Sequence, residues 1–144
     1  MRYLGIDIGK RAIGVAIGEM LASELTTLRC SKEESFYEGV AMKRAFDELA
    51  KLIELEQADA VVVGLPVDEE GNPTQESEQI EKFCQKFEDE KNVSIHFVDE
   101  TLTSFMAEEI LESQGVDKKE AEEREHQLAA QLILQQYFEE NEIA

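Results

Sequence analysis

Asp7 is the first residue of this chain whose position suggests chemistry. It interrupts an apolar, strand-like run between Ile6 and Ile8, where an ionised carboxylate costs several kcal/mol to bury unless a cation compensates it. Glycines flank this run, and glycine lets a backbone turn sharply or lets a ligand approach closely. Asp7 therefore either faces solvent or caps a turn, or it binds a metal ion or polarises a phosphate at the end of a strand.

Two further side chains could join Asp7 in one site. Glu100, with Asp99 before it, stands directly past a predicted strand. His126 lies one turn before a pair of alanines on the apolar stripe of the last predicted helix, so its ring should point inward. His126 is then either a core or rim histidine that donates to a backbone carbonyl, or a member of the site.

Hydrophobic periodicity predicts the elements that must position these groups. We expect strands at residues 3–8, 12–17, 25–30, 60–64 and 93–98. We expect helices at residues 36–56, 74–92, 103–115 and 119–140. The first three strands should form an antiparallel meander, and a right-handed crossover should place the fourth strand parallel to the first. Ligands of such sheets bind outside the carboxyl ends of the parallel strands, where Asp7 and Glu100 would converge.

Composition and charge bound the class of protein. A chain of 144 residues with 42% hydrophobic content can bury one core, so we expect a single domain over residues 1–144. No apolar run is long enough to span a membrane and no signal peptide pattern is visible, so we expect a cytoplasmic protein without a membrane partner. Cys30 and Cys84 lack the spacing of a metal site and should be free thiols.

The net charge of -19 argues against a broad basic surface that neutralises phosphates. The charge is uneven, however. Residues 1–30 carry Arg2, Lys10, Arg11 and Arg29, whereas the excess of acid lies in the helical remainder. Acidic runs of this kind are most often solvated faces.

Four stretches of the chain, taken together, resemble the YqgF family of Holliday junction resolvases and pre-16S rRNA nucleases. They are LGIDIGKRAIGVAIG at 4–18, VVVGLPVDEEGNP at 61–73, VDETLTS at 98–104 and QLAAQLILQQYF at 127–138, and they come in the order of the family. The resemblance implies a ribonuclease H-like α/β fold, with helices around a mixed five-stranded sheet. Its strand order would be 3-2-1-4-5, with the second strand antiparallel.

The resemblance also implies a function. A member of the family would be a metal-dependent endonuclease that hydrolyses phosphodiester bonds in structured nucleic acid, chiefly at the 5′ end of pre-16S rRNA in ribosome biogenesis, with branched DNA as the alternative substrate. Asp7, Glu100 and His126 would be catalytic and would bind Mg²⁺ or Mn²⁺. The chain would act as a monomer or a homodimer. The substrate contacts would come from Gly9, Lys10, Arg11, Thr101 and Thr103.

Two residues depart from the family pattern. Thr101 stands where the family usually has arginine, which removes a bidentate phosphate donor. His126 stands where the family usually has aspartate, and a neutral nitrogen suits zinc, manganese or iron better than magnesium. His126 could still act as a general base or bind a softer metal. Both departures, with the acidic surface, favour as a second hypothesis a degenerate domain that binds nucleic acid or protein without cutting.

A third hypothesis is a nucleotide-binding phosphotransferase. Asp7, Gly9 and the glycine at 14 also resemble the phosphate loop of sugar kinases and actin. Those proteins need a second phosphate loop and a second domain, for which 144 residues leave no room.

Overall fold

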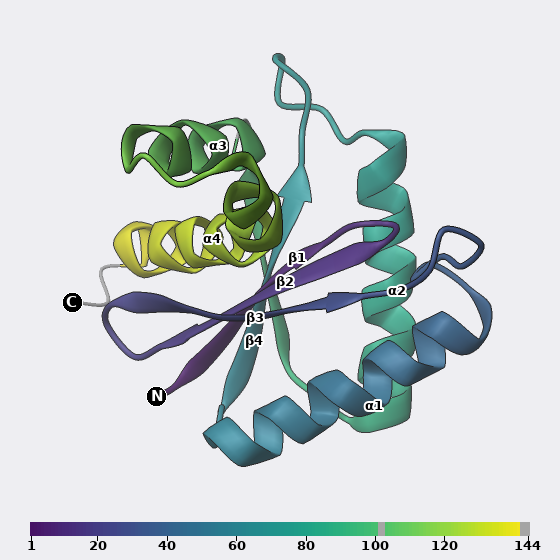
Figure 1. Cartoon of the computed structure of the whole chain (residues 1–144). Coiled ribbons are helices and arrows are strands. Elements are labelled where there is room, and N and C mark those ends of the chain that lie inside the picture. Colours follow the sequence, from purple (N-terminus) through teal and green to yellow (C-terminus); the bar gives the residue numbers. More distant parts are fainter. Residues whose placement is uncertain (101–102, 142–144) are drawn as a thin grey trace.

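A mixed five-stranded sheet forms the centre of the structure (Figure 1). The computed structural model describes residues 1–100 and 103–141. The strands are β1 (Tyr3–Ile8), β2 (Ala12–Gly18), β3 (Ala22–Arg29), β4 (Ala60–Pro66) and β5 (Ile95–Glu100). They lie in the order β3-β2-β1-β4-β5; β2 is antiparallel to both of its neighbours, and β4 is parallel to β1 and β5. The predicted sheet and its order are confirmed.

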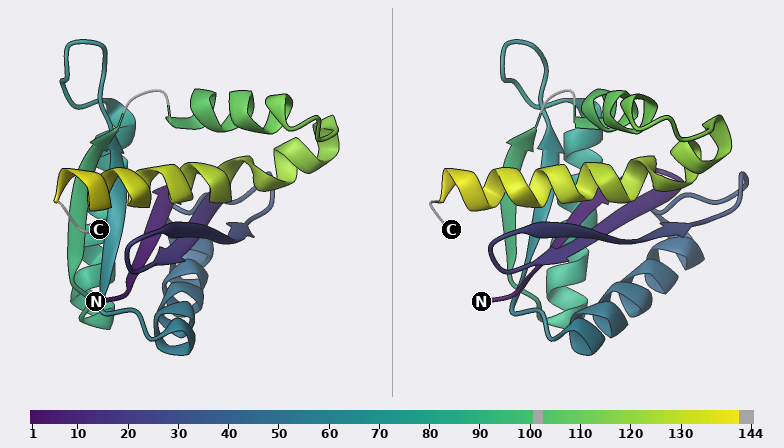
Figure 2. Two further views of the ribbon diagram at one scale, coloured as in Figure 1. Left: turned by 90° about the vertical axis from the view of Figure 1, so that its left-hand side faces the viewer. Right: turned by 60° about the vertical axis from the view of Figure 1, so that its left-hand side comes forward.

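Helices cover both faces of this sheet (Figure 2). They are α1 (Gly39–Glu56), α2 (Gln75–Lys91), α3 (Thr103–Ser113) and α4 (Lys118–Glu140). The helices α1 and α2 lie on one face, α4 crosses the other face, and α3 packs on the outer side of α4. In the part of the chain that the structure describes, no helix is both long and apolar enough to cross a membrane.

The buried β4 strand shows how the sequence builds these layers. Its side chains alternate, so Val61 and Val63 pack with the core of α1 and α2 while Val62 packs with α4. A strand buried on both faces accounts for the continuous apolar run of 60–63. The predicted free thiols are confirmed, with Cys84 buried and Cys30 half-buried.

Several element boundaries differ from the sequence-based prediction by one to three residues. The strand β3 begins at Ala22 because its pairing with β2 continues to Gly18, through a register shift that obscures the alternation. The helix α1 begins at Gly39, three residues later than expected. Asp99 and Glu100 are the last two residues of β5 and do not follow it, since the pairing with β4 extends to Pro66 and Glu100.

The start of α2 is tied to the end of β4 by a buried serine. Thr74 and Ser77 form a capping box, in which the Ser77 backbone N–H donates to the Thr74 hydroxyl at 3.2 Å. The Ser77 hydroxyl also donates to the carbonyl oxygen of Pro66, the last residue of β4. The first turn of α2, with Glu76 in it, is therefore held at the carboxyl end of the parallel strands.

We expect Ser77→Ala to lower the free energy of unfolding by about 1–3 kcal/mol, because it removes the acceptor of the Thr74 N–H in the capping box and leaves the half-buried Pro66 carbonyl without this donor. Urea denaturation measures this. Glu78→Ala, at the exposed neighbouring position, should change the free energy by less than about 0.5 kcal/mol. Equal effects of the two substitutions would contradict the assigned role of Ser77.

Candidate functional site

Asp7 lies at the carboxyl end of β1, on the face of the sheet that α4 covers. It is the penultimate residue of the strand and stands opposite Gly14 of β2. Two residues earlier on the same face, a Cβ added at Gly5 would meet Leu134 of α4 at 2.7 Å. The Asp7 side chain is 18% exposed, so its carboxylate is largely withdrawn from water. This placement is the one that suits a ligand-binding acid.

Gly14 brings the second site residue to Asp7. A Cβ built at Gly14 would overlap the backbone carbonyl group of His126, so α4 rests directly on β2 at this point. Because Asp7 is the neighbour of Gly14 across the β1–β2 pair, His126 arrives beside it. The His126 Nδ1 atom lies 3.9 Å from Asp7 Oδ2, and the His126 side chain is 32% exposed. The predicted inward orientation of His126 is therefore what the structure shows.

Polar contacts to β3 fix this part of α4 in register. The Arg124 guanidinium donates to the Glu24 carboxylate at 2.8 Å, and Gln127 Nε2 donates to the same carboxylate at 3.2 Å. The Thr27 hydroxyl donates to Gln127 Oε1, also at 3.2 Å. These contacts bracket His126 on both sides, so the position of its ring does not depend on the 3.9 Å approach to Asp7 alone.

Glu100 ends β5 on the same face of the sheet. A Cβ built at Gly64 of β4 would meet Glu100 Cγ at 3.0 Å and Ile133 Cδ1 of α4 at 2.6 Å. Gly64 follows Val63, which pairs with Ile6, so Gly64 also lies next to Asp7. The strand between the two acids thus carries no side chain at the point where they approach each other.

Glu76 is a third acid that the sequence reasoning did not include. Burial raises its pKa above the ordinary value for glutamate, and the negative charges of Asp7 and Glu100 raise it further. Glu76 therefore lies within electrostatic reach of both acids. The sequence does contain a signal for Glu76, which is an acid in the first turn of a helix that follows a strand. The start of such a helix lies at the carboxyl edge of the sheet, where the site is.

Glu125 and Glu108 add further negative charge near Asp7, on the side of α3. Burial raises the pKa of Glu125, and the charge of Glu108, a hydrogen bond to Glu108 and the charge of Asp7 add to the effect, while His126 opposes it. Glu125 precedes His126 in α4, and Glu108 belongs to α3. Carboxylates thus surround Asp7 on several sides.

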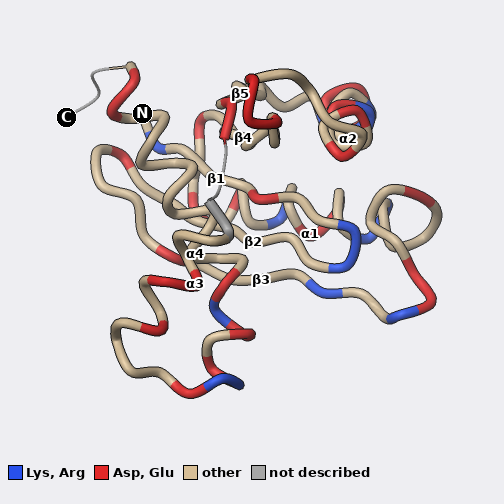
Figure 3. The backbone as a smooth tube through the Cα atoms, turned by 90° about the horizontal axis from the view of Figure 1, so that it is seen from above, with Lys and Arg blue, Asp and Glu red and all other residues tan. Residues whose placement is uncertain are grey.

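The residues predicted to contact substrate are distributed over two places. Gly9, Lys10 and Arg11 form the β1–β2 turn, which the Gly9 backbone N–H closes by donating to the Ala12 carbonyl at 2.9 Å. Arg11 Nη2 donates to the Lys32 carbonyl at 3.0 Å, so the guanidinium is held on the loop after β3. Figure 3 shows basic residues on this turn and on that loop.

The other two predicted contacts fall at the β5–α3 junction. Thr101 lies outside the described residues. Thr103 is the first residue of α3, and its side chain is also outside the description. Nothing in the structure therefore bears on their predicted contact with substrate.

The donors at this edge suit a divalent cation in their chemistry. Asp7, Glu76 and Glu100 offer the hard oxygens that Mg²⁺ and Mn²⁺ bind, and His126 adds a nitrogen that Mn²⁺ accepts more readily than Mg²⁺. Among residues 1–100 and 103–141, however, no three histidine, cysteine, aspartate or glutamate side chains are grouped closely enough to hold a metal ion. The described side chains provide the donor types but not a closed coordination shell.

The fold and this edge define a ribonuclease H-like α/β protein. Two solved structures share the fold over nearly the whole chain. One is Thermus thermophilus RuvC in complex with a Holliday junction substrate, with a TM-score of 0.61, 16% identity and coverage of 98% of this chain and 96% of that one. The other is the fowlpox virus Holliday junction resolvase, with a TM-score of 0.56, 10% identity and coverage of 98% and 99%.

The sequence gives the family. The model of the RuvX family, described as Holliday junction resolvase, matches residues 1–140. A protein of Natranaerobius thermophilus named "Putative pre-16S rRNA nuclease" is 34% identical, over 96% of this chain and 94% of its own length. A protein of the same name from Caldanaerobacter subterraneus subsp. tengcongensis is 36% identical, over 96% of each. The chain belongs to the RuvX family, which is the YqgF family of the resemblance described above.

We expect Gly14→Ala to lower the free energy of unfolding by about 3 kcal/mol or more, because the new Cβ overlaps the His126 carbonyl group and α4 must move away from β2. Gly9→Ala in the same hairpin is the matched control, since its Cβ would meet only the Ala12 carbonyl oxygen, at 3.0 Å. Denaturant unfolding compares the two. A Gly14→Ala protein as stable as Gly9→Ala would contradict the proposed contact.

We expect Glu76→Gln to raise stability at pH 7.5 and to have no effect at low pH. The pKa of Glu76 is raised by folding, so the ionised side chain destabilises the folded state above that pKa. This penalty vanishes as the pH falls through the raised pKa and below the ordinary glutamate pKa of 4.5, where the wild-type side chain becomes protonated in both states. Urea midpoints of wild type and variant across this range measure the difference. A gain that persists below pH 4.5 would contradict the assignment.

Proposed function

We propose that this chain is a divalent-metal-dependent endonuclease that hydrolyses phosphodiester bonds in structured nucleic acid. One observation carries the proposal: the fold places the Asp7 carboxylate 3.9 Å from His126, with Glu100 across Gly64, at the carboxyl edge of the sheet. Carboxylates and an imidazole at such an edge can bind a metal ion and move a proton. The names of the curated relatives and of the family support this reading.

Each of the three side chains has a role that its chemistry allows. Asp7 and Glu100 would hold Mg²⁺ or Mn²⁺, which supplies Lewis-acid stabilisation of the charge that develops on the phosphate oxygens. The His126 imidazole would either complete the ligand set or accept the proton of the attacking water.

The substrate that we favour is the 5′ end of pre-16S rRNA. Several curated relatives at 32–36% identity carry the name of a pre-16S rRNA nuclease. Branched DNA is the alternative, because the family model is described as a Holliday junction resolvase and the Thermus thermophilus RuvC structure is a complex with a Holliday junction substrate. Both substrates require the same hydrolytic chemistry, and cleavage of the two can be compared directly.

A second candidate function is binding of nucleic acid without cleavage. It is favoured by the finding that the described side chains form no group of three ligands close enough to hold a metal ion. The replacement of the family aspartate by His126 points the same way. A protein of this kind would bind the same nucleic acids but would leave them intact in the presence of Mg²⁺ or Mn²⁺.

We expect Asp7→Asn to lower the rate of cleavage by about 100-fold or more, since it removes a metal-binding carboxylate and leaves the shape of the side chain unchanged. The assay follows a labelled RNA that contains the 5′ end of pre-16S rRNA, beside a four-way DNA junction, in Mg²⁺ or Mn²⁺. His96→Gln is the control, because His96 is an exposed residue of β5. Its ring centroid lies 5.7 Å from that of Tyr137. Cleavage by wild type that survives in Asp7→Asn would contradict the proposed site, and no cleavage by wild type would favour the binding function.

We expect His126→Asp to shift the metal preference of cleavage from Mn²⁺ towards Mg²⁺, because it replaces a nitrogen donor with a hard oxygen. The ratio of the cleavage rate in Mn²⁺ to the cleavage rate in Mg²⁺, measured for the wild type and for the variant, reports this shift. A lower rate in both metals with an unchanged ratio would instead assign His126 to proton transfer.

A further inference from the structure

A pocket with two lysines lies beside the β1–β2 turn, on the side of α1 and α2. It has a volume of about 310 Å³ and is lined by Lys10, Ser35, Tyr37, Glu38, Gln79 and Lys82. Lys10 comes from the β1–β2 turn, three residues after Asp7, and Lys82 comes from α2, six residues after Glu76. Two lysines and one glutamate are among the lining residues, so these residues carry a net positive charge in a chain whose net charge is -19.

The two lysines of this pocket belong to the cations that have no acidic or carbonyl partner within bonding distance among the described residues, whereas six other cations have one. Arg2, Arg44, Lys91 and Arg124 are in salt bridges with glutamate or aspartate, and Arg11 and Arg29 donate to backbone carbonyls. Over the residues that the structure describes, neither Lys10 nor Lys82 makes a salt bridge or a side-chain hydrogen bond. Their charges are therefore available to an external anion.

Tyr37 also lines the pocket, and its hydroxyl is buried within electrostatic reach of Glu76 and Asp7. This hydroxyl is the buried side-chain oxygen that has no hydrogen-bond partner among the described residues. A buried hydroxyl without a partner costs about 1–3 kcal/mol, so such groups usually have a role. Burial raises the pKa of Tyr37, and the charges of Glu76 and Asp7 raise it further, so the group remains a donor and lies near the candidate site.

We propose that Lys10, Lys82 and the Tyr37 hydroxyl bind a phosphate group of the nucleic-acid strand on which the Asp7 site acts. This inference rests on the proposed function and adds to it the face of the protein along which the strand runs. A phosphodiester carries one negative charge and several acceptor oxygens, which match the excess positive charge and the unpartnered donor. The strand would cross the β1–β2 turn, from the acids at β1 and β5 to the start of α1 and α2.

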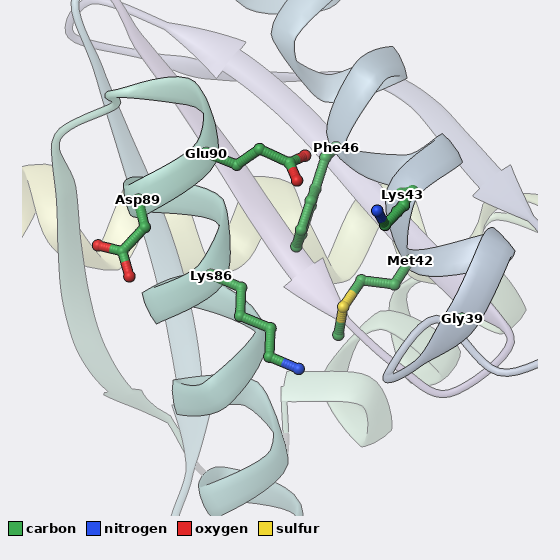
Figure 4. Close-up of a pocket in the computed structure, with 7 residues that line it drawn as sticks. All are labelled: Gly39, Met42, Lys43, Phe46, Lys86, Asp89 and Glu90. Atoms are coloured by element: carbon green, nitrogen blue, oxygen red, sulfur yellow. The ribbon is translucent and has the colours of Figure 1, made fainter.

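Lys86 provides a matched control on the same helix. It lies four residues after Lys82, but it lines a different pocket, between α1 and α2, together with Met42 and Phe46 (Figure 4). Substitution of either lysine by alanine changes the net charge equally. Any difference between the two variants therefore reports the place of the charge and not its amount.

The experiment is a fluorescence-anisotropy titration of the pre-16S rRNA fragment with EDTA present, so that binding is measured without cleavage. We expect Lys82→Ala to weaken binding about threefold to tenfold, and to lower the slope of log K against log [salt] by about 0.7–0.9, which is the loss of one phosphate contact. Lys86→Ala should leave both quantities near the wild-type values. Equal effects of the two substitutions would overturn the subsite while leaving the proposed function intact.

Tyr37→Phe separates a binding role from a structural one. Removal of an unpartnered hydroxyl should leave the urea midpoint unchanged or higher, yet it should weaken RNA binding about threefold. Unchanged RNA binding in Tyr37→Phe would remove the hydroxyl from the subsite.

The source of the phosphate is tested by competition. A 5′-mononucleotide that displaces the RNA at micromolar concentration, in a manner that depends on Lys82, would show a site for free nucleotides and overturn the strand assignment. We expect displacement only at millimolar concentration. No binding of RNA or junction DNA by the wild type would overturn both the subsite and the proposed function.

Discussion

The absence of a side chain at Gly14 is the constraint on which the site depends. It allows the α4 backbone at His126 to rest on β2, and Asp7 stands opposite Gly14 in the adjacent strand. Any side chain there would displace the helix, and with it the 3.9 Å approach of the His126 imidazole to the Asp7 carboxylate. Gly64 plays a similar part between Asp7 and Glu100. Two glycines thus decide which side chains can act together.

The charges of the protein are divided along one edge of the sheet. Acids gather where β1, β5 and the start of α2 meet, as the raised pKa of Glu76 records. Basic residues lie on the β1–β2 turn and the loop that follows β3 (Figure 3). A polyanion would be repelled by the first group unless a divalent cation offset its charge, and attracted by the second. Such a division reconciles a net charge of -19 with a nucleic-acid substrate.

The sheet order and most element boundaries were predictable because they follow from local periodicity and from the handedness of crossovers. The sequence also placed Asp7 and His126 correctly at the edge of the sheet, since one lies in a short strand and the other on an apolar helical stripe. Glu76 could not be found in this way, because its approach to Asp7 depends on how Ser77 ties α2 to the end of β4. The hydrogen bond from Arg11 to the Lys32 carbonyl could not be predicted either, because Lys32 lies in a loop and hydrophobic periodicity does not predict the path of a loop.

The account rests on the claim that Asp7 belongs to a divalent-metal site. The most direct test is a titration of the protein alone with Mn²⁺ at physiological salt. Electron paramagnetic resonance measures the concentration of the free ion at each step. We predict one saturable class of site in the wild type that is lost in Asp7→Asn and retained in Asp89→Asn, which removes the same charge from the far end of α2. No saturable binding by the wild type, or binding that Asp7→Asn leaves unchanged, would contradict the account.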